Sequence, residues 1–297
     1  MRRITDAAIH SIAGLRPWQL TTAAAFAFNV ATVSIPGRID DEMQKRVREA
    51  RRARAKDKKE NEDDESATKE HAIPLDSEYR SLFTPAGWAF AIWGVIYAGE
   101  MALVVRALTT TDGAAGRDVA PWFALACGFQ GLWCAAFRPW ARKPRHFWVS
   151  SALLIAEAFA LGGAHRVLRS AANAMSSAEF WTTHAPLSLH FGWISCAALV
   201  NLNSFVAKTC GVDTQLAVAF ASAYGAAALG VAVSASSGDA LYGCVVAWAL
   251  AAVASDGGKR TTETLGEVPL RALAKAARWS SRIVLVFGVA RAMAMQA

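Results

Sequence analysis

A long apolar run begins with the stretch Phe83-Thr84-Pro85-Ala86-Gly87-Trp88-Ala89-Phe90-Ala91-Ile92-Trp93-Gly94-Val95-Ile96-Tyr97. A proline is tolerated in the first turn of a helix, so Pro85 is compatible with a helix that starts here. Trp93 and Tyr97 stand four residues apart, which puts their rings on one face of that helix. Large flat rings that face a membrane interior suit large flat ligands. The stretch therefore predicts a membrane helix with an aromatic face.

The rest of the chain repeats this apolar character, which predicts an all-α integral membrane protein. Of its 297 residues, 54% are hydrophobic and 19% are charged, a balance that differs from that of soluble domains. A membrane-spanning helix needs roughly 20 apolar residues. We expect eight spans, at residues 18–35, 86–105, 119–137, 147–161, 186–207, 214–235, 240–255 and 283–295, of which the fourth, seventh and eighth are marginal. Buried helices of a large soluble protein are the alternative interpretation.

The distribution of charge predicts how the spans are organised. Most of the 31 Lys and Arg residues fall in connections that share one side of the membrane if all spans cross, and such loops usually stay in the cytosol. The loop after the first span is therefore expected in the cytosol, and both termini on the far side. The expected divisions are an N-terminal segment (1–17), a first transmembrane helix (18–36), a charged cytosolic loop (37–82), the remaining core helices (83–208) and three C-terminal helices (209–297).

Two polar segments have more than one interpretation. The first 17 residues carry Arg2, Arg3 and Arg16 and are expected to form an interfacial helix, with a removed targeting presequence as the alternative. The stretch 40–70 has a basic block followed by an acidic one, which predicts a solvated loop, with a docking or lipid-sensing segment as the alternative. The sequence does not name the membrane, and an organelle envelope and an endomembrane both fit.

The sequence argues against several classes of function. The formal charge of +7 comes from residues that flank membrane spans, so the expected partner is membrane lipid and not nucleic acid. The sequence contains no nucleotide-binding glycine loop, His-Glu-x-x-His zinc pattern or Gly-x-Ser-x-Gly elbow. The five cysteines lie in or beside apolar spans without a Cys-x-x-Cys pair, so neither a disulfide framework nor a metal site is expected. We therefore expect no enzyme and no obligatory cofactor.

Three groups of aromatic residues are the strongest functional signals. The groups are Pro85-Ala86-Gly87-Trp88-x-Phe90-x-x-Trp93-x-x-x-Tyr97, Gln130-Gly131-Leu132-Trp133-x-x-x-Phe137 and Trp193-Ile194-Ser195-Cys196-Ala197-Ala198-Leu199-Val200-Asn201. The second and third groups place rings near polar side chains, which need internal partners in a membrane. An interfacial aromatic belt is the simpler explanation of any single tryptophan. Three groups on separate helices favour a shared pocket.

At these residues the chain resembles the TspO/translocator protein family, the tryptophan-rich sensory proteins, and looks most like its longer branch. The match is close in the fifth span, where Trp193, Ser195, Ala197 and Asn201 occupy corresponding positions. In the second span the match needs a one-residue gap, and in the third Gln130 stands where the family usually has Asn. The resemblance covers roughly residues 18–208 and leaves the three C-terminal spans without a counterpart.

The resemblance implies a five-helix bundle, here with about three additional C-terminal helices, around a cavity for planar hydrophobic ligands such as protoporphyrin IX, haem or sterol-like molecules. The protein would be a non-enzymatic receptor or carrier, and a homodimer is compatible with the family. Some members of the family are reported to degrade porphyrin photochemically, and the resemblance would extend this activity to Trp193. Porphyrin ranks above sterol, because Phe205 replaces the tyrosine of the family's sterol-recognition pattern. The implied ligand-binding residues are Trp88, Phe90, Trp93, Tyr97, Gln130, Trp133, Trp193, Ser195, Ala197 and Asn201.

Three ionisable residues inside the predicted spans have no role in this resemblance. Glu100, Glu157 and His190 fall in the second, fourth and fifth spans, where an unpaired charge is costly. His190 could pair with either glutamate, coordinate haem iron, or be an ordinary hydrogen-bonded core histidine. If the carboxyl groups line an ion or proton path, the alternative function is a secondary transporter or a proton-linked channel. A structural membrane subunit, which recruits partners through the charged loop, is the third hypothesis.

Overall fold

The computed structural model describes residues 14–38, 81–110, 114–138, 143–171, 175–256 and 265–294. Within these ranges every regular element is helical, which confirms the predicted all-α class. The predicted N-terminal segment and charged loop lie largely outside the described residues. The long helices are α2 (Pro17–Ser34), α4 (Ile92–Thr109), α5 (Ala114–Ala136), α6 (Pro144–Ser170), α8 (Ala185–Thr209), α9 (Val212–Ser237), α10 (Ala240–Asp256) and α12 (Glu267–Ala294). Short turns are η3 (Gly87–Ala91), α7 (Ser177–Glu179) and η6 (Phe180–His184).

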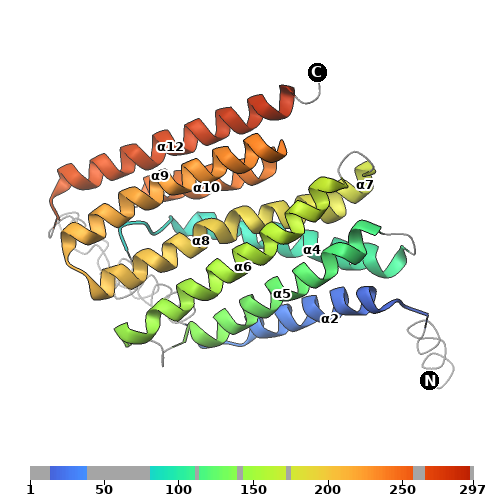
Figure 1. The fold of residues 1–297 in the computed structure, drawn as a ribbon. Coiled ribbons are helices and arrows are strands. Elements are labelled where there is room, and N and C mark those ends of the chain that lie inside the picture. The colour runs from blue at the N-terminus through green and yellow to red at the C-terminus, as the bar shows by residue number, and fades with distance from the viewer. Residues whose placement is uncertain are drawn as a thin grey trace, which may run out of the picture.

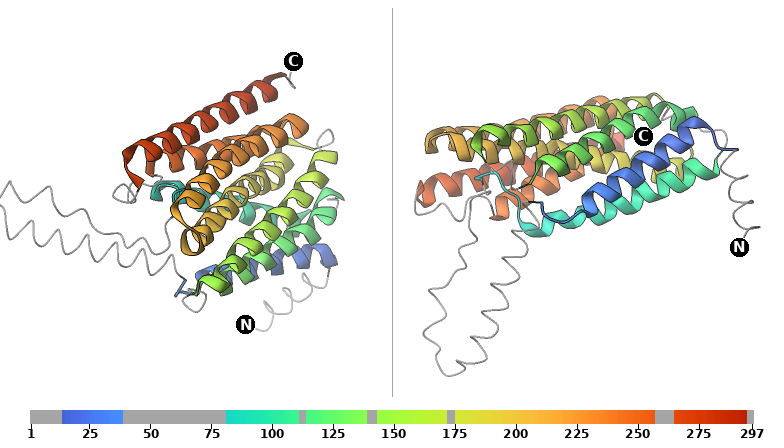
Figure 2. Two further views of the ribbon diagram at one scale, coloured as in Figure 1. Left: turned by 60° about the vertical axis from the view of Figure 1, so that its left-hand side comes forward. Right: turned by 90° about the horizontal axis from the view of Figure 1, so that it is seen from below.

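The long helices run side by side in two groups that meet at α8 (Figure 1). In the first group α2 and α5 pack together, α5 packs on α6, and both α6 and α4 pack on α8. In the second group α9, α10 and α12 pack on one another, with α9 and α10 also against α8. Figure 2 shows α2 and α12 at opposite edges of the molecule. α8 is therefore the helix around which both groups are built.

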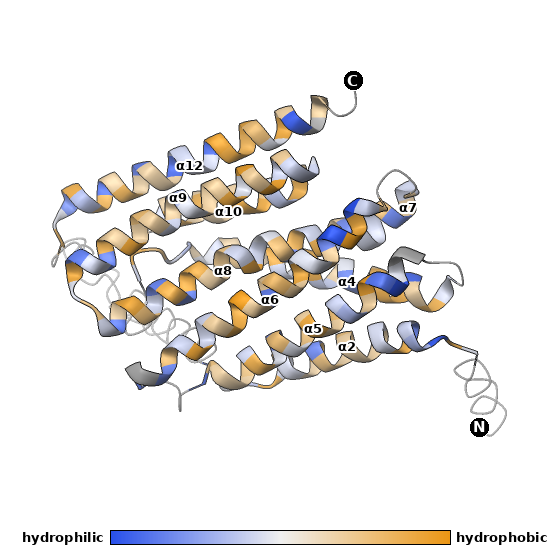
Figure 3. Ribbon diagram, in the orientation of Figure 1, coloured by the Kyte–Doolittle hydropathy of each residue, from blue (hydrophilic) through white to orange (hydrophobic). Residues whose placement is uncertain are grey.

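Hydropathy agrees with a multi-pass membrane protein. Among the described residues, five helical stretches are long and apolar enough to cross a membrane: Gly87–Thr109, Gly116–Ala136, His146–Ser170, Ser177–Thr209 and Val212–Ser237. Ala240–Ser255 is apolar but shorter than these five. The helices at the predicted first and last spans, as far as they are described, do not combine the necessary length with the necessary hydropathy. Apolar residues run along most of the length of these helices (Figure 3). Exposed side chains such as Phe159 and Tyr224 then face lipid.

Two helices extend well beyond the spans predicted for them. α6 begins with a proline at its first turn and continues past residue 161 to Ser170. A Cβ at Gly163 would lie 2.3 Å from the Trp122 ring, so the glycine lets α5 and α6 approach closely. α12 begins at Glu267, sixteen residues before the predicted span, because its first half is amphipathic and not uniformly apolar.

Candidate functional site

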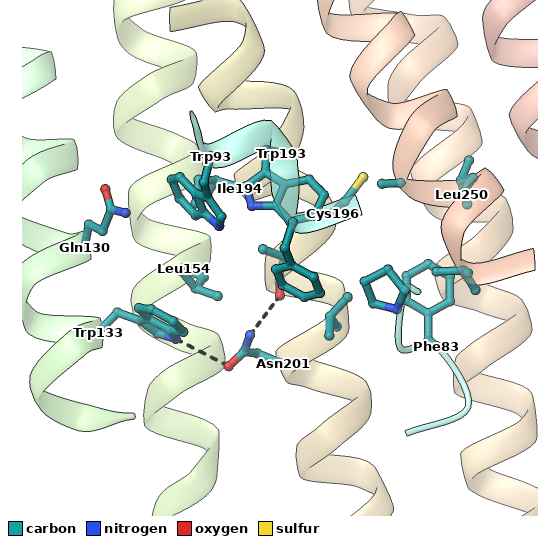
Figure 4. Close-up of a pocket in the computed structure, with 16 residues that line it drawn as sticks. Phe83, Trp93, Gln130, Trp133, Leu154, Trp193, Ile194, Cys196, Asn201 and Leu250 are labelled. Atoms are coloured by element: carbon teal, nitrogen blue, oxygen red, sulfur yellow. Dashed lines mark hydrogen bonds between the residues drawn. The ribbon is translucent and has the colours of Figure 1, made fainter. Parts of the chain in front are cut away.

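A pocket in the membrane-embedded part of the molecule lies where the two groups of helices meet. Its walls come from the segment before η3, from η3 itself, and from α4, α5, α6, α8 and α10 (Figure 4). The cavity has a volume of about 80 Å³. Its lining residues are Phe83, Pro85, Phe90, Trp93, Gln130, Trp133, Leu154, Trp193, Ile194, Cys196, Ala197, Val200, Asn201, Ala249, Leu250 and Val253.

Aromatic rings from different helices converge on this pocket. Trp193 on α8 is 3% exposed, and its ring meets Phe90 edge to face with centroids 5.4 Å apart. Trp93 also meets Trp193 edge to face, at 6.3 Å, and stacks on Tyr97 at 5.4 Å. Trp133 approaches from α5 and stacks on Phe137, with centroids 5.0 Å apart. These spacings are those of favourable aromatic pairs, so the rings hold one another in place.

A polar group on the α5 and α8 side of the pocket fixes the orientation of Trp133. The indole Nε1 of Trp133 donates to Ser150 Oγ at 2.9 Å and, more weakly, to Asn201 Oδ1 at 3.4 Å. Ser150 Oγ donates to the same Asn201 oxygen, and Asn201 Nδ2 donates to the carbonyl oxygen of Ala197 at 3.0 Å (Figure 4). Asn201 therefore joins α5, α6 and α8, as a buried polar group needs in lipid.

Gln130 forms a second polar link at the same pocket. Its Oε1 accepts from Asn29 Nδ2 at 2.8 Å, and its Nε2 donates to the Tyr97 hydroxyl at 3.0 Å. Asn29 lies on α2 and Tyr97 on α4, so one amide on α5 connects three helices. Gln130 and Tyr97, both in the predicted ligand-binding set, are thus in contact, but Tyr97 stacks on Trp93 and is not part of the lining.

Two other residues of the predicted ligand-binding set face elsewhere. Trp88 packs edge to face on Trp248 of α10, with centroids 4.6 Å apart, and is not part of the lining. Ser195 points toward α10, where its hydroxyl accepts from the Tyr242 hydroxyl at 3.1 Å and donates to Phe191 O. Helix rotation decides this outcome, because Ser195 lies two residues from both Trp193 and Ala197 and so faces away from them.

Part of the lining could not have been found from the aromatic motifs. Ala249, Leu250 and Val253 of α10 close one side of the pocket. They are common aliphatic residues in an apolar helix, so the sequence gives no signal that distinguishes them from lipid-facing ones. α10 is held there by two contacts with the segment before α4: the Trp248 Nε1 donates to Ala89 O at 3.2 Å, and Ala86 N donates to Ala252 O at 3.1 Å.

The three ionisable residues singled out in the sequence form a single buried triad. His190 Nδ1 lies 2.6 Å from Glu100 Oε1, and His190 Nε2 lies 3.1 Å from Glu157 Oε1, close enough for an ion pair but not aligned as a hydrogen bond. All three side chains are 0% exposed. Both imidazole nitrogens are therefore occupied by glutamates, and His190 offers no nitrogen to a haem iron without losing one of them.

The triad lies directly behind the aromatic wall. The Trp93 ring, which lines the pocket, meets the His190 ring edge to face with centroids 5.5 Å apart. An imidazolium with one carboxylate and one carboxylic acid would be neutral overall, the arrangement that costs least in apolar surroundings. The triad could thus hold or pass a proton, and Trp93 separates that proton from the pocket.

Comparison with known proteins gives one match. The model of a protein family, described as TSPO-like protein, matches residues 68–288. This range contains η3, α4 to α10 and most of α12, but not α2. The match thus includes the C-terminal helices that the sequence resemblance had left without a counterpart. A search of curated proteins and a search of solved structures gave no match.

Proposed function

Since the chain belongs to the TSPO-like protein family and is a multi-pass membrane protein, we propose that it is a receptor or carrier for a planar hydrophobic ligand of the tetrapyrrole class. The observation that supports this function best is the convergence of Phe90, Trp93, Trp133 and Trp193 on one intramembrane pocket. Indole and phenyl faces attract flat apolar ligands, and lipid on the outside gives such a ligand a route to the protein. The proposed role is binding and transfer, without catalysis.

The polar residues of the pocket suit the acidic edge of such a ligand. A side-chain amide nitrogen carries two N–H donors. Asn201 uses one toward Ala197 O, and Gln130 uses one toward the Tyr97 hydroxyl. Because both residues line the pocket, the second N–H of each amide could meet a propionate or carbonyl oxygen. A ligand with an apolar face and an oxygen-bearing edge therefore matches the lining better than a pure hydrocarbon does.

A tetrapyrrole needs more room than this cavity offers without rearrangement. The volume is about 80 Å³, whereas pockets for drug-sized ligands usually have roughly 300–1,000 Å³. The side most able to move contains Phe90, which is 47% exposed, and the 3₁₀ turn Gly87–Ala91 that carries it. A 3₁₀ turn has poorer hydrogen-bond geometry than an α-helix, so it is the part of this wall that rearranges most easily. We propose that ligand entry displaces Phe90 and this turn, while Trp133 and Trp193 stay in place.

The test is equilibrium binding of protoporphyrin IX to the purified full-length protein in detergent, followed by the absorption change of the porphyrin. We expect saturable binding that weakens about tenfold or more, ~1.4 kcal/mol, in Trp133→Ala and Trp193→Ala. Ala197→Phe should have the same effect by filling the pocket while all tryptophans remain. Trp148→Ala is the matched control, because Trp148 is exposed on α6 and lies outside the lining.

The results distinguish this proposal from simpler ones. Equal affinities in the wild type, Ala197→Phe and the tryptophan variants would mean that porphyrin adsorbs elsewhere, and would remove the pocket as its site. Tighter binding of a sterol than of porphyrin would overturn the ligand class but keep the pocket.

A second candidate function is proton-linked transport, and the buried triad of Glu100, Glu157 and His190 favours it. Intramembrane ionisable residues in contact with one another commonly serve proton relays. Vesicles that contain the protein should then take up or release protons at a rate that falls in Glu100→Gln and in Glu157→Gln. A flux that is the same with and without the protein would exclude this function.

A further inference from the structure

A second cluster of polar side chains lies apart from the pocket and from the triad. It consists of His165 near the end of α6, His184 in η6 and Asp239 in the turn between α9 and α10. These elements meet at the end of the bundle where α7 lies (Figure 1). From each residue one ligand atom lies within 4.8 Å of those of the other two. Along α8, His184 and the pocket residue Trp193 are roughly 13 Å apart at 1.5 Å per residue.

We propose that His165, His184 and Asp239 bind a divalent transition-metal ion, with Zn²⁺ as the best chemical match. Two imidazole nitrogens and one carboxylate oxygen are ligands that Zn²⁺ prefers, and three protein ligands leave a fourth position for water or another small ligand. No metal site is expected from the sequence, and residues 165, 184 and 239 follow no short spacing pattern. The fold alone brings them together.

One observation distinguishes this cluster from an ordinary hydrogen-bond network. His184 is 8% exposed, and its Nδ1 is buried without a hydrogen-bond partner. A buried polar atom in this condition usually costs free energy. His184 also sits in a single π-turn, Phe180–His184, an irregularity that recurs at functional sites. The ring stacks on Phe180 with centroids 5.1 Å apart, which fixes its plane.

The carboxylate is held in position as metal ligands usually are. Asp239 Oδ1 accepts from the backbone N–H groups of Leu241 and Tyr242, at 2.9 and 3.2 Å. Its other oxygen, Oδ2, lies 2.8 Å from His165 Nε2 and also accepts from Ser188 Oγ. One oxygen thus caps α10 while the other faces the histidines, an outer-shell arrangement that orients a ligand.

The cluster lies at the end of its helices, so an ion can reach it from the aqueous side without crossing the apolar interior. A bound ion would take the place of the hydrogen bond between His165 Nε2 and Asp239 Oδ2.

The primary test is zinc content. The full-length protein, purified in detergent with its affinity tag removed, is stripped with a chelator, incubated with Zn²⁺ alone and desalted. Elemental analysis should then give about one zinc per chain, as a site with three protein ligands predicts. Asp239→Asn keeps an oxygen to cap α10 but loses the negative charge, and His184→Gln removes a ring nitrogen. Both should bind Zn²⁺ at least ~10-fold more weakly. His146→Gln, at the opposite end of α6, is the matched control and should bind as the wild type does.

A second measurement needs no variant and therefore does not depend on folding of the mutants. Diethyl pyrocarbonate reaches buried histidine nitrogens only when the protein opens locally, and mass spectrometry locates the residues modified after long exposure to it. Zn²⁺ should protect His165 and His184 in the wild-type protein and leave His146 as reactive as before. Zinc that is lost on desalting of the wild type, or full retention in both Asp239→Asn and His184→Gln, would overturn the proposal. Unchanged modification of His165 and His184 in the presence of Zn²⁺ would do the same.

Discussion

In the part of the chain that the structure describes, His190 is the basic side chain that contacts both Glu100 and Glu157. Glu100 comes from α4 and Glu157 from α6, while His190 itself lies on α8. Removing one partner of a buried ionic contact leaves an uncompensated charge, which usually costs more than the contact contributed. His190 is therefore the residue of this triad whose loss is least tolerated, whether the triad moves protons or only holds the helices together.

We predict that His190→Ala lowers the free energy of unfolding by about 3–5 kcal/mol. Glu157→Gln should lower it by less, because the amide keeps the shape of the side chain and the contact of His190 with Glu100 remains. Thermal unfolding in detergent measures both, with His146→Ala as the control. A melting temperature for His190→Ala equal to that of Glu157→Gln would contradict the argument from charge balance.

Asn201 is the polar residue whose loss should affect both stability and binding. Asn201→Leu removes the acceptor for Ser150 and the second acceptor for Trp133, so we expect a loss of about 1–3 kcal/mol. Trp133 should also lose its fixed orientation, which would weaken porphyrin binding. The same thermal and binding measurements apply. Ser204→Ala, one turn further along α8 and outside the lining, should leave porphyrin affinity unchanged.

At the scale of the elements, the close contact between α8 and α10 depends on Gly192, which has no side chain. A Cβ at Gly192 would lie 2.9 Å from Val245 Cβ and 3.1 Å from the carbonyl oxygen of Tyr242. Backbone atoms cannot rotate away as a side-chain end can, so the two helices would have to separate. Small residues are the usual means of close approach between membrane helices.

Gly192→Ala is therefore predicted to destabilise the protein by about 1–3 kcal/mol, the usual range for an overpacked contact. Gly128→Ala is the matched control, since a Cβ there meets nothing within 4 Å. That substitution should be neutral or stabilising by up to about 1 kcal/mol, because glycine weakens a helix. Equal melting temperatures for the two variants would show that the contact between α8 and α10 can accommodate a methyl group at Gly192.

The sequence predicted the elements better than their ends or their rotation. The apolar runs of α5, α8 and α9 are long and uniform, so hydropathy alone locates them. The sequence predicts only the apolar second half of α12, because basic side chains interrupt the apolar pattern before it. These are Arg271, Lys275, Arg278 and Arg282. The site shows the same limit: Trp193 and Ala197 line the pocket, whereas Ser195 faces Tyr242. Hydropathy does not show which face of a uniformly apolar helix points into the pocket.

At the scale of the whole molecule, the pocket belongs to both groups of helices. The aromatic residues come from the first group, and α10 of the second group closes the remaining side with Ala249, Leu250 and Val253. Contacts between residues so distant along the chain form only in the folded bundle. This explains why the sequence indicated the aromatic side of the pocket and not the aliphatic one.

A larger side chain at a lining position of α10 should consequently weaken ligand binding as strongly as one on α8. We predict that Ala249→Phe lowers porphyrin affinity about tenfold or more by filling the pocket. Ala251→Phe makes the same change on the same helix but away from the lining, and should leave affinity unaltered. If the two variants bind porphyrin equally well, the ligand does not use the α10 side.

The α10 wall also constrains how a shorter relative could work. A chain that ended after the fifth core helix would keep Trp93, Trp133 and Trp193 but would leave the flank beside Leu250 open to acyl chains. Such a protein would have to seal the flank with a neighbouring subunit or accept leakage of its ligand into the bilayer. Here α10, the helix that covers this flank, belongs to the same polypeptide. A single chain can therefore close its own pocket, and dimerisation would not be needed to seal it.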